Sequence, residues 1–243
     1  MKKRILIVSP HPDDAVFSLG AHILHYNQYQ ILVWNLFSIQ NYSIHKSAEN
    51  PKDEIIKEDK EAAEQLGFQV QYENYKEAGM RGCHKLSKIF NYTTIREEDK
   101  EIFSSLVQRM ALFLESKSFD KIYIPLGCGG HVDHILARDS FLTWWLEQNK
   151  HDFKLYAYED LPYGTNSEWL QKSLEISNKY SLHPHFMEIN CYINDKLTAI
   201  AIYKSQIRKR DLEIIKTHSF DTQYGCMVER TWEIKPKYEK VTF

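Results

Sequence analysis

Two short segments of the chain combine imidazole and carboxylate side chains at close spacing. Residues 11–14 read His-Pro-Asp-Asp, and residues 131–134 read His-Val-Asp-His. Imidazole nitrogens and carboxylate oxygens are ligands that suit Zn²⁺ and similar divalent ions. Adjacent aspartates cannot easily both bind one ion, so the second carboxylate would be free to accept a proton from water beside the metal. The competing interpretation of residues 11–14 is that an aspartate only caps the following helix.

Each of these segments follows an apolar run that predicts a buried strand, at residues 5–8 and 121–126. Open α/β sheets bind their ligands at the carboxyl ends of such strands. Because both segments would converge on this edge, we expect them to share one metal site. Between the second strand and its His/Asp segment lie Gly-Cys-Gly-Gly at 127–130, whose N–H groups could donate to a bound oxyanion.

The rest of the chain alternates predicted strands and helices, which indicates one doubly wound α/β domain. Gly20 lies in the apolar stripe of the first helix and would let that helix lie close to the sheet. Residues 76–94 show little periodicity and are interpreted as an irregular segment that could overhang a site. We expect further strands at 30–37, 69–75, 154–158 and 186–193, helices from Asp14 and over 52–67, 101–116, 134–147 and 167–179, and a long helix capped by Asp195 that runs to about residue 217.

Composition excludes several classes of protein. The 243 residues carry a net charge of −2, which gives no basic field for nucleic acid or an anionic membrane, and the basic run at 208–210 is interpreted as a solvated helix face. The four cysteines form no C-x-x-C pair, so we expect reduced thiols. No apolar run reaches the roughly 20 residues of a membrane span, and the run after the basic start is too short for a signal peptide. We therefore expect a cytoplasmic protein.

At residues 11–14 and 131–134 the sequence resembles the PIG-L/LmbE-like family of zinc-dependent N-deacetylases, whose marks are a strand ending in His-Pro-Asp-Asp and a later His-x-Asp-His. The likeness is greatest over residues 4–20 and 122–137. It implies one Rossmann-like domain over residues 1–243, with a mostly parallel twisted sheet covered by helices on both faces. The resemblance makes His11, Asp14 and His134 the metal ligands, Asp13 the general base and His131 the electrophilic or general-acid partner.

The resemblance implies the removal of an acetyl group from an amino sugar or a related amine, with Zn²⁺, Fe²⁺ or another divalent ion as cofactor. In this hypothesis Asp13 takes a proton from the attacking water, and His131, as an imidazolium oriented by Asp133, stabilises the oxyanion. The sequence departs from the family at two positions. Ala15 stands where the family often has Glu, and Gly129 stands where some members have Tyr. A phenolic donor to the oxyanion would therefore have to come from elsewhere.

Substrate contacts are predicted at Arg81, in the irregular segment, and at Glu159 and Tyr163, after the strand at 154–158, although packing or surface pairing would explain each equally well. The expected partner is a small N-acetylated molecule, such as a sugar conjugate, and a homo-oligomer is compatible with the sequence. A non-catalytic carbohydrate-binding module would not need an unligated carboxylate beside the metal, so Asp13 separates the two interpretations. A deacylase of a non-sugar N-acyl amine in natural-product biosynthesis stays open.

Overall fold

The computed structural model describes residues 2–45, 50–83, 85–148, 152–175 and 180–237. Its strands are β1 (Arg4–Ser9), β2 (Gln30–Asn35), β3 (Gln69–Tyr72), β4 (Lys121–Pro125), β5 (Lys154–Tyr158), β6 (Tyr180–Glu188), β7 (Phe220–Asp221) and β8 (Cys226–Pro236). Its helices are α1 (Asp14–His25), α2 (Pro51–Leu66), α3 (Lys100–Glu115), α4 (Val132–Glu147), α5 (Ser167–Leu174), α6 (Ile193–Ile200) and α7 (Lys209–Ser219).

The strands form one sheet in the order β3-β2-β1-β4-β5-β8-β6, with β7 paired to β8. The strands from β3 to β5 are parallel, whereas β8 runs antiparallel to both β5 and β6. The aliphatic residues of β1 are buried because helices cover both sides of the sheet. The predicted α/β class, with a mostly parallel sheet between helices, is confirmed.

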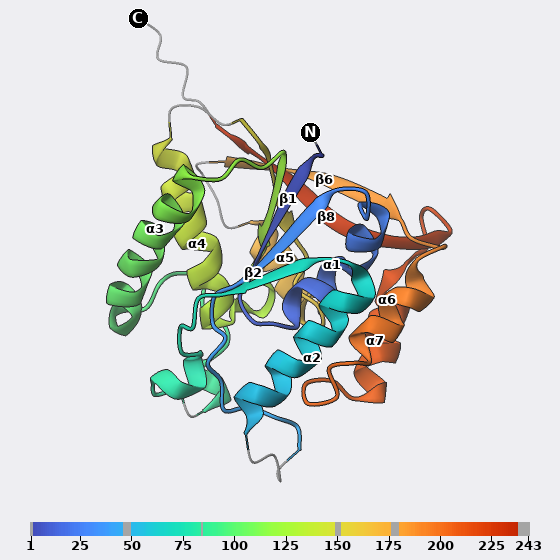
Figure 1. The fold of residues 1–243 in the computed structure, drawn as a ribbon, viewed down its shortest axis with the longest axis horizontal. Coiled ribbons are helices and arrows are strands. Elements are labelled where there is room, and N and C mark those ends of the chain that lie inside the picture. The colour runs from blue at the N-terminus through green and yellow to red at the C-terminus, as the bar shows by residue number, and fades with distance from the viewer. Residues whose placement is uncertain (1, 46–49, 84, 149–151, 176–179, 238–243) are drawn as a thin grey trace, which may run out of the picture.

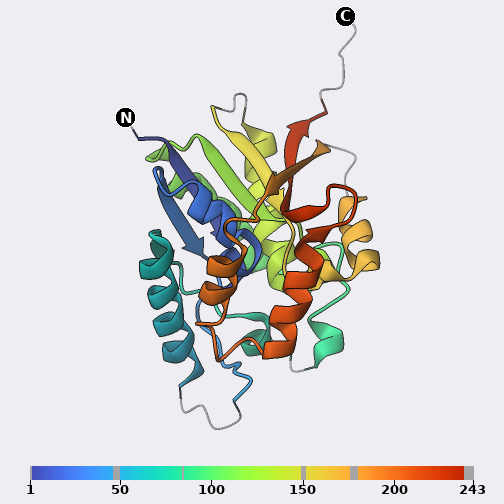
Figure 2. The ribbon, with the colours of Figure 1, turned by 90° about the vertical axis from the view of Figure 1, so that its right-hand side faces the viewer.

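Helices cover the two faces of the sheet in separate groups (Figure 1). On one face α3 and α4 pack over a core that includes Trp34 and Phe113, whose rings stack with centroids 3.8 Å apart. On the other face α1, α2, α6 and α7 cover a second core; Figure 2 shows α2, α6 and α7 beside one another on this side. No helix in the described part of the chain has both the length and the apolar surface to cross a membrane.

The topology explains why two segments 120 residues apart in the sequence meet. Strands β1 and β4 are hydrogen-bonded neighbours, and Ile5 lies opposite Lys121. From β1 the chain crosses to β2 on one side, and from β4 it crosses to β5 on the other side. Loops that leave neighbouring strands in opposite directions open a crevice at the carboxyl edge of the sheet. The loops after β1 and β4 therefore border the same crevice.

The structure differs from the sequence predictions at four points in the C-terminal part. The expected helix from Asp195 to about 217 is divided into α6 and α7, and the residue at the N-terminal cap of α6 is Tyr192. The helix breaks because the chain turns inward at Tyr203, which is fully buried and donates its hydroxyl to Asp59 Oδ1 (2.8 Å). The strand expected at 186–193 is β6, which ends at Glu188, and the strand β8 was not predicted. The expected helix at 167–179 ends at Leu174 in α5, and residues 176–179 lie outside the described residues.

The sequence suggested that Gly20 lets α1 lie close to the sheet, but in the structure Gly20 faces α6 instead. A Cβ at this position would lie 3.0 Å from Cγ of Lys196, so Gly20 makes room for the side chain of α6. Lys196 is fully buried and its Nζ lies 2.6 Å from Glu229 Oε1 on β8. Glu229 also accepts the backbone N–H groups of Ala21 and His22, each at 2.8 Å. A buried ion pair thus joins α1, α6 and β8.

Candidate metal and active site

The turn after β1 is held in place by neighbouring groups on both sides. Ser9 donates its hydroxyl to the carbonyl of His11 (2.6 Å) and accepts the backbone N–H of Ala15 (3.2 Å). After α6, the hydroxyl of Tyr203, which donates to Asp59 on α2, lies 3.2 Å from the carbonyl oxygen of Pro12. The helix α1 begins directly after this turn, and the side chain of Asp13 forms no capping hydrogen bond to it. The structure therefore argues against the interpretation that Asp13 is only a helix cap.

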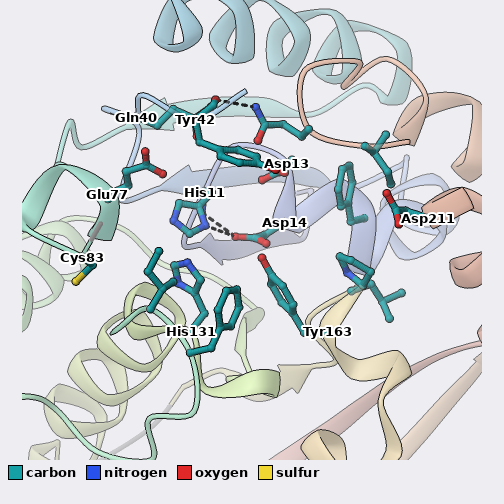
Figure 3. Close-up of a pocket in the computed structure, with 18 of the residues that line it drawn as sticks. His11, Asp13, Asp14, Gln40, Tyr42, Glu77, Cys83, His131, Tyr163 and Asp211 are labelled. Carbon is teal, nitrogen blue, oxygen red and sulfur yellow. Dashed lines mark hydrogen bonds and ion pairs between the residues drawn. The ribbon is translucent and has the colours of Figure 1, made fainter. Parts of the chain in front are cut away.

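Three side chains from this turn and from the first turn of α4 point toward one another (Figure 3 shows His11 and Asp14). His11 Nδ1 lies 3.1 Å from Asp14 Oδ2, and His134 Nε2 lies 3.3 Å from the same oxygen. One ligand atom from each residue lies within 4.8 Å of the other two. The residues that the resemblance implies as metal ligands are thus close enough to share a single ion.

The buried nitrogen Nε2 of His134 tests whether a metal ion fits this cluster. His134 is fully buried, and Nε2 has no hydrogen-bond partner in the described part of the chain. Its Nδ1 lies 2.6 Å from Asp160 Oδ1, so Asp160 accepts the proton on Nδ1 and leaves a lone pair on Nε2. An unpaired buried polar atom costs about 1–3 kcal/mol. A divalent ion held by His134, His11 and Asp14 would remove this cost, so the donor set fits a metal.

Asp160 lies against the candidate metal ligand His134, a position that the sequence analysis did not assign to it. It is fully buried directly after β5, and its second oxygen accepts the backbone N–H groups of Gly127 (2.7 Å) and Cys128 (2.9 Å). One carboxylate therefore fixes both the ring of His134 and the glycine loop after β4. Because these N–H groups are occupied, Gly127 and Cys128 do not offer the oxyanion donors that the sequence suggested. Its position after a predicted strand was the signal that could have identified Asp160.

The protonation state of His131 differs from the one that the sequence analysis expected. The backbone N–H of Asp133 donates to His131 Nδ1 (3.2 Å), so His131 caps α4 and carries its own proton on Nε2. Burial lowers the pKa of His131 well below its ordinary value, despite the nearby Asp133 carboxylate. His131 is therefore a neutral hydrogen-bond donor, whereas the sequence analysis expected an imidazolium.

The carboxylate of Asp133 orients His11, whereas the sequence analysis assigned it to His131. Its Oδ2 lies 3.0 Å from His11 Nε2 and accepts the backbone N–H of Ala78 (2.8 Å), and its Oδ1 lies 2.8 Å from Arg81 Nη1. His11, His131 and Asp133 also come within ligand distance of one another. Because Asp133 already has these partners, the set of His11, Asp14 and His134 fits an ion better.

A cavity of about 550 Å³ opens above these residues, between the turn after β1 and the irregular segment that contains Glu77 and Phe90. His11, Asp13 and His131 all line it. Burial and, after it, the adjacent Asp14 carboxylate raise the pKa of Asp13 to about 7. A carboxyl group with this pKa can both accept and release a proton near neutral pH.

Of the three predicted substrate contacts, only Tyr163 lines the cavity. Its ring lies edge-on to His134, with centroids 5.5 Å apart, and its hydroxyl points toward Asp14 in Figure 3. Arg81 is engaged by Asp133 and by Asp99 Oδ1 (3.3 Å), and Glu159 is buried against His218 Nε2 (2.9 Å). Arg81 and Glu159 are therefore not brought to the cavity surface.

The fold and the site together define a Rossmann-like α/β protein with a buried His/Asp cluster at the carboxyl edge of its sheet. A family model described as "PIG-L: GlcNAc-PI de-N-acetylase" matches residues 6–145, which include both motifs. The chain belongs to this PIG-L family, and the resemblance noted in the sequence is confirmed.

Among curated proteins, the chain is similar to 2'-N-acetylparomamine deacetylase of Streptomyces fradiae. The two are 21% identical over 220 residues, which cover 84% of this chain and 73% of the relative. The two sequences are thus distantly similar.

Solved structures share the fold over nearly the whole chain. A deacetylase of the teicoplanin biosynthesis pathway, in complex with bog, has a TM-score of 0.81, 19% identity and coverage of 98% of this chain and 100% of that chain. A zinc-inhibited form of teicoplanin deacetylase Orf2 has a TM-score of 0.77 and 19% identity, with coverage of 98% and 100%. GalB of Pseudomonas putida KT2440, a 4-carboxy-2-hydroxymuconate hydratase, has a TM-score of 0.63 and 16% identity, with coverage of 99% and 98%. Since a hydratase shares the fold, the reaction has to be argued from the site.

Proposed function

We propose that this protein is a metal-dependent N-deacetylase that acts on an amino sugar or a related amine conjugate. The observation that carries the proposal is the buried Nε2 of His134, which has no hydrogen-bond partner among the described residues and faces Asp14 and His11, with the Asp13 carboxylate lining the adjacent cavity. His11, Asp14 and His134 would hold Zn²⁺ or another divalent ion such as Fe²⁺. The names of the similar deacetylases support the substrate class, since they refer to paromamine and teicoplanin.

When bound, a divalent ion would lower the pKa of a water molecule and polarise the amide carbonyl of the substrate. Asp13 accepts the proton of the attacking water on its carboxylate, which lines the cavity and has a pKa raised to about 7. The protonated Asp13 then donates to the departing amine. The products are acetate and a free amine, and the protein forms no covalent bond with the substrate.

Two groups can donate hydrogen bonds to the oxygen that becomes negative during the attack. His131 offers the N–H at Nε2, because its Nδ1 is occupied by the backbone of Asp133. Tyr163 offers its phenolic O–H, whose pKa is raised by burial and then by the carboxylates of Asp14 and Asp13, so the phenol keeps its proton. Tyr163 would supply the phenol that some family members carry at the position of Gly129, where a Cβ would lie 3.4 Å from Cβ of Tyr163.

The test is a screen of N-acetylated amino sugars and their conjugates for released amine and acetate. The protein is stripped with a chelator and reloaded with Zn²⁺ or Fe²⁺ before assay. We expect release by the reloaded protein and loss of release after chelation. The proposal is wrong if the metal-loaded protein releases amine from no member of the panel, or if chelation leaves the rate unchanged. If the metal-loaded protein binds a sugar but does not deacetylate it, the result would instead support a carbohydrate-binding module.

A further inference from the structure

The cavity above the candidate metal ligands carries four carboxylates and, among the described residues, no lysine or arginine. Asp13, Asp14, Glu77 and Asp211 all line it, and none of the lining residues in the described part of the chain is Lys or Arg. These carboxylates are spread across the cavity: Figure 3 shows Glu77 at one side, Asp211 at the opposite side, and Asp13 and Asp14 between them. A ligand that spans this cavity therefore meets a carboxylate at each end, with Asp13 and Asp14 at the centre.

A divalent ion would offset only the central part of this charge. Asp14 is one of the candidate ligands, whereas neither Glu77 nor Asp211 belongs to a group that could hold an ion. Glu77 Oε1 accepts the backbone N–H of Asn41 (2.9 Å) and forms no ion pair among the described residues. With the metal in place, carboxylates thus remain on both sides of it.

The neighbouring cations do not neutralise these two carboxylates. Lys76, next to Glu77 in the sequence, is exposed to solvent, and Arg81 is paired with Asp133 and Asp99. Arg210 Nε lies 3.9 Å from Asp211 Oδ1, but its side chain is 79% exposed, so solvent screens the pair. Asp211 Oδ2 accepts the backbone N–H of Arg208 (3.1 Å), which leaves its charge in place.

The other lining groups are suited to a polyhydroxylated ring system. Gln40, Asn41 and Gln206 offer amide groups that can donate to and accept from hydroxyls, and Phe17 and Leu161 offer apolar surface for ring faces. We propose that the cavity selects N-acylated amino sugars that carry additional free ammonium groups, and that it disfavours phosphorylated or carboxylated sugars. This inference rests on the proposed function, since it concerns the substrate class of the same site.

The binding test uses the metal-loaded protein and paromamine, an amino-sugar conjugate with several ammonium groups and no acetyl group. Isothermal titration calorimetry should detect paromamine binding that weakens as the salt rises from about 0.05 to 0.5 M, because salt screens charge pairs. We expect N-acetylglucosamine 6-phosphate to show no binding under the same conditions. Each of Glu77→Gln and Asp211→Asn should weaken paromamine binding about fivefold, the upper range for a partly exposed charge pair.

Glu213→Gln is the matched control, because Glu213 is exposed on the same helix as Asp211 and does not line the cavity. It removes the same charge from the protein and should leave paromamine binding unchanged. The inference is overturned if paromamine binding does not depend on salt, if the phosphosugar binds as tightly, or if Glu213→Gln weakens binding as much as the cavity variants.

The binding measurement needs no turnover, so it separates the two proposals. A protein that deacetylates N-acetylated sugars but binds paromamine no better than the phosphosugar retains the proposed function and loses this inference. A protein that binds paromamine in the expected way but deacetylates nothing keeps a site for cationic sugars and loses the proposed activity.

Discussion

At the scale of single residues, replacing Asp13 and replacing His134 should have different effects on the rate and on metal content, although the two residues lie close together. Asp13→Ala removes the proton acceptor and should lower kcat by at least about 100-fold while the protein keeps its metal. His134→Ala removes a ligand and should deplete the metal. Elemental analysis of both variants, alongside the rate, checks the assignment. Full metal content in His134→Ala, or normal turnover in Asp13→Ala, would contradict it.

Asp160 should affect metal affinity without touching the ion. Its Oδ1 accepts from His134 Nδ1 at 2.6 Å, and partners of this kind fix the orientation of a ligating imidazole. Asp160→Asn should weaken metal binding about 10–100-fold, as measured by competition with a chromophoric chelator. Glu64→Gln, an exposed position on α2, serves as the control. Equal affinities in the wild type and Asp160→Asn would exclude this role.

Tyr163 should contribute to the rate more than to binding. If its hydroxyl donates to the developing oxyanion, Tyr163→Phe should lower kcat about 100-fold, the usual loss for one such donor, with little change in KM. Steady-state kinetics on the best substrate of the panel provides the measurement. A change confined to KM would instead identify Tyr163 as a substrate contact only.

The sequence identified the candidate site because its chemistry is concentrated in two short motifs at strand ends. It could not assign partners: Asp133 orients His11 through a 3.0 Å contact that depends on how the loops after β1 and β4 face each other. Likewise, an arginine at position 81 suggests sugar recognition, but in the fold it is placed against Asp99 and Asp133. Residue types predict what a site can do, whereas tertiary contacts decide which group does it.

At the scale of elements, β1, β2 and β4 were predictable because each lies in a compact apolar run, and β5 begins and ends where the sequence predicted. Helix α2 ends at Gly67, as expected, because this residue adopts φ of 77°. The division of α6 from α7 was not predictable, since it depends on a buried hydrogen bond between Tyr203 and Asp59 that lies far along the chain. Local patterns determine elements unless a long-range polar contact interrupts them.

The ion pair that joins α1, α6 and β8 should make stability depend on acid pH. Burial alone raises the pKa of Glu229, but Lys196 and His22 outweigh it and lower this pKa to about 2 from 4.5. Because the folded value is the lower one, the stabilisation is complete above pH 4.5 and is lost as the pH falls toward 2. The shift corresponds to about 3 kcal/mol of unfolding free energy.

The matching experiment compares denaturant unfolding of the wild type and Glu229→Gln between pH 7 and pH 3. The variant should be less stable at pH 7, because Lys196 is left buried without its partner. The difference between the two proteins should narrow as the pH falls. A difference that stays constant, or widens, across this range would rule out the proposed role of the Glu229 charge.

At the scale of the whole molecule, metal binding should stabilise the fold, because the candidate ligands come from two separate parts of the chain. An ion that binds only the folded state at about 100 times its Kd adds about 2.7 kcal/mol. For a chain of this size, that corresponds to a Tm increase of about 5–10 °C. Calorimetry with and without a chelator measures it, and His134→Ala should show no shift. An equal shift in that variant would place the ion elsewhere.

The buried carboxylate of Glu229 also affects the order in which the protein can fold during synthesis. It accepts the amide of Ala21 across 208 residues of chain. During synthesis, α1 is therefore made well before Glu229, and this carboxylate can bind it only after the residues between them have left the ribosome. The nascent chain therefore contains both His/Asp motifs before it contains the residue that anchors α1.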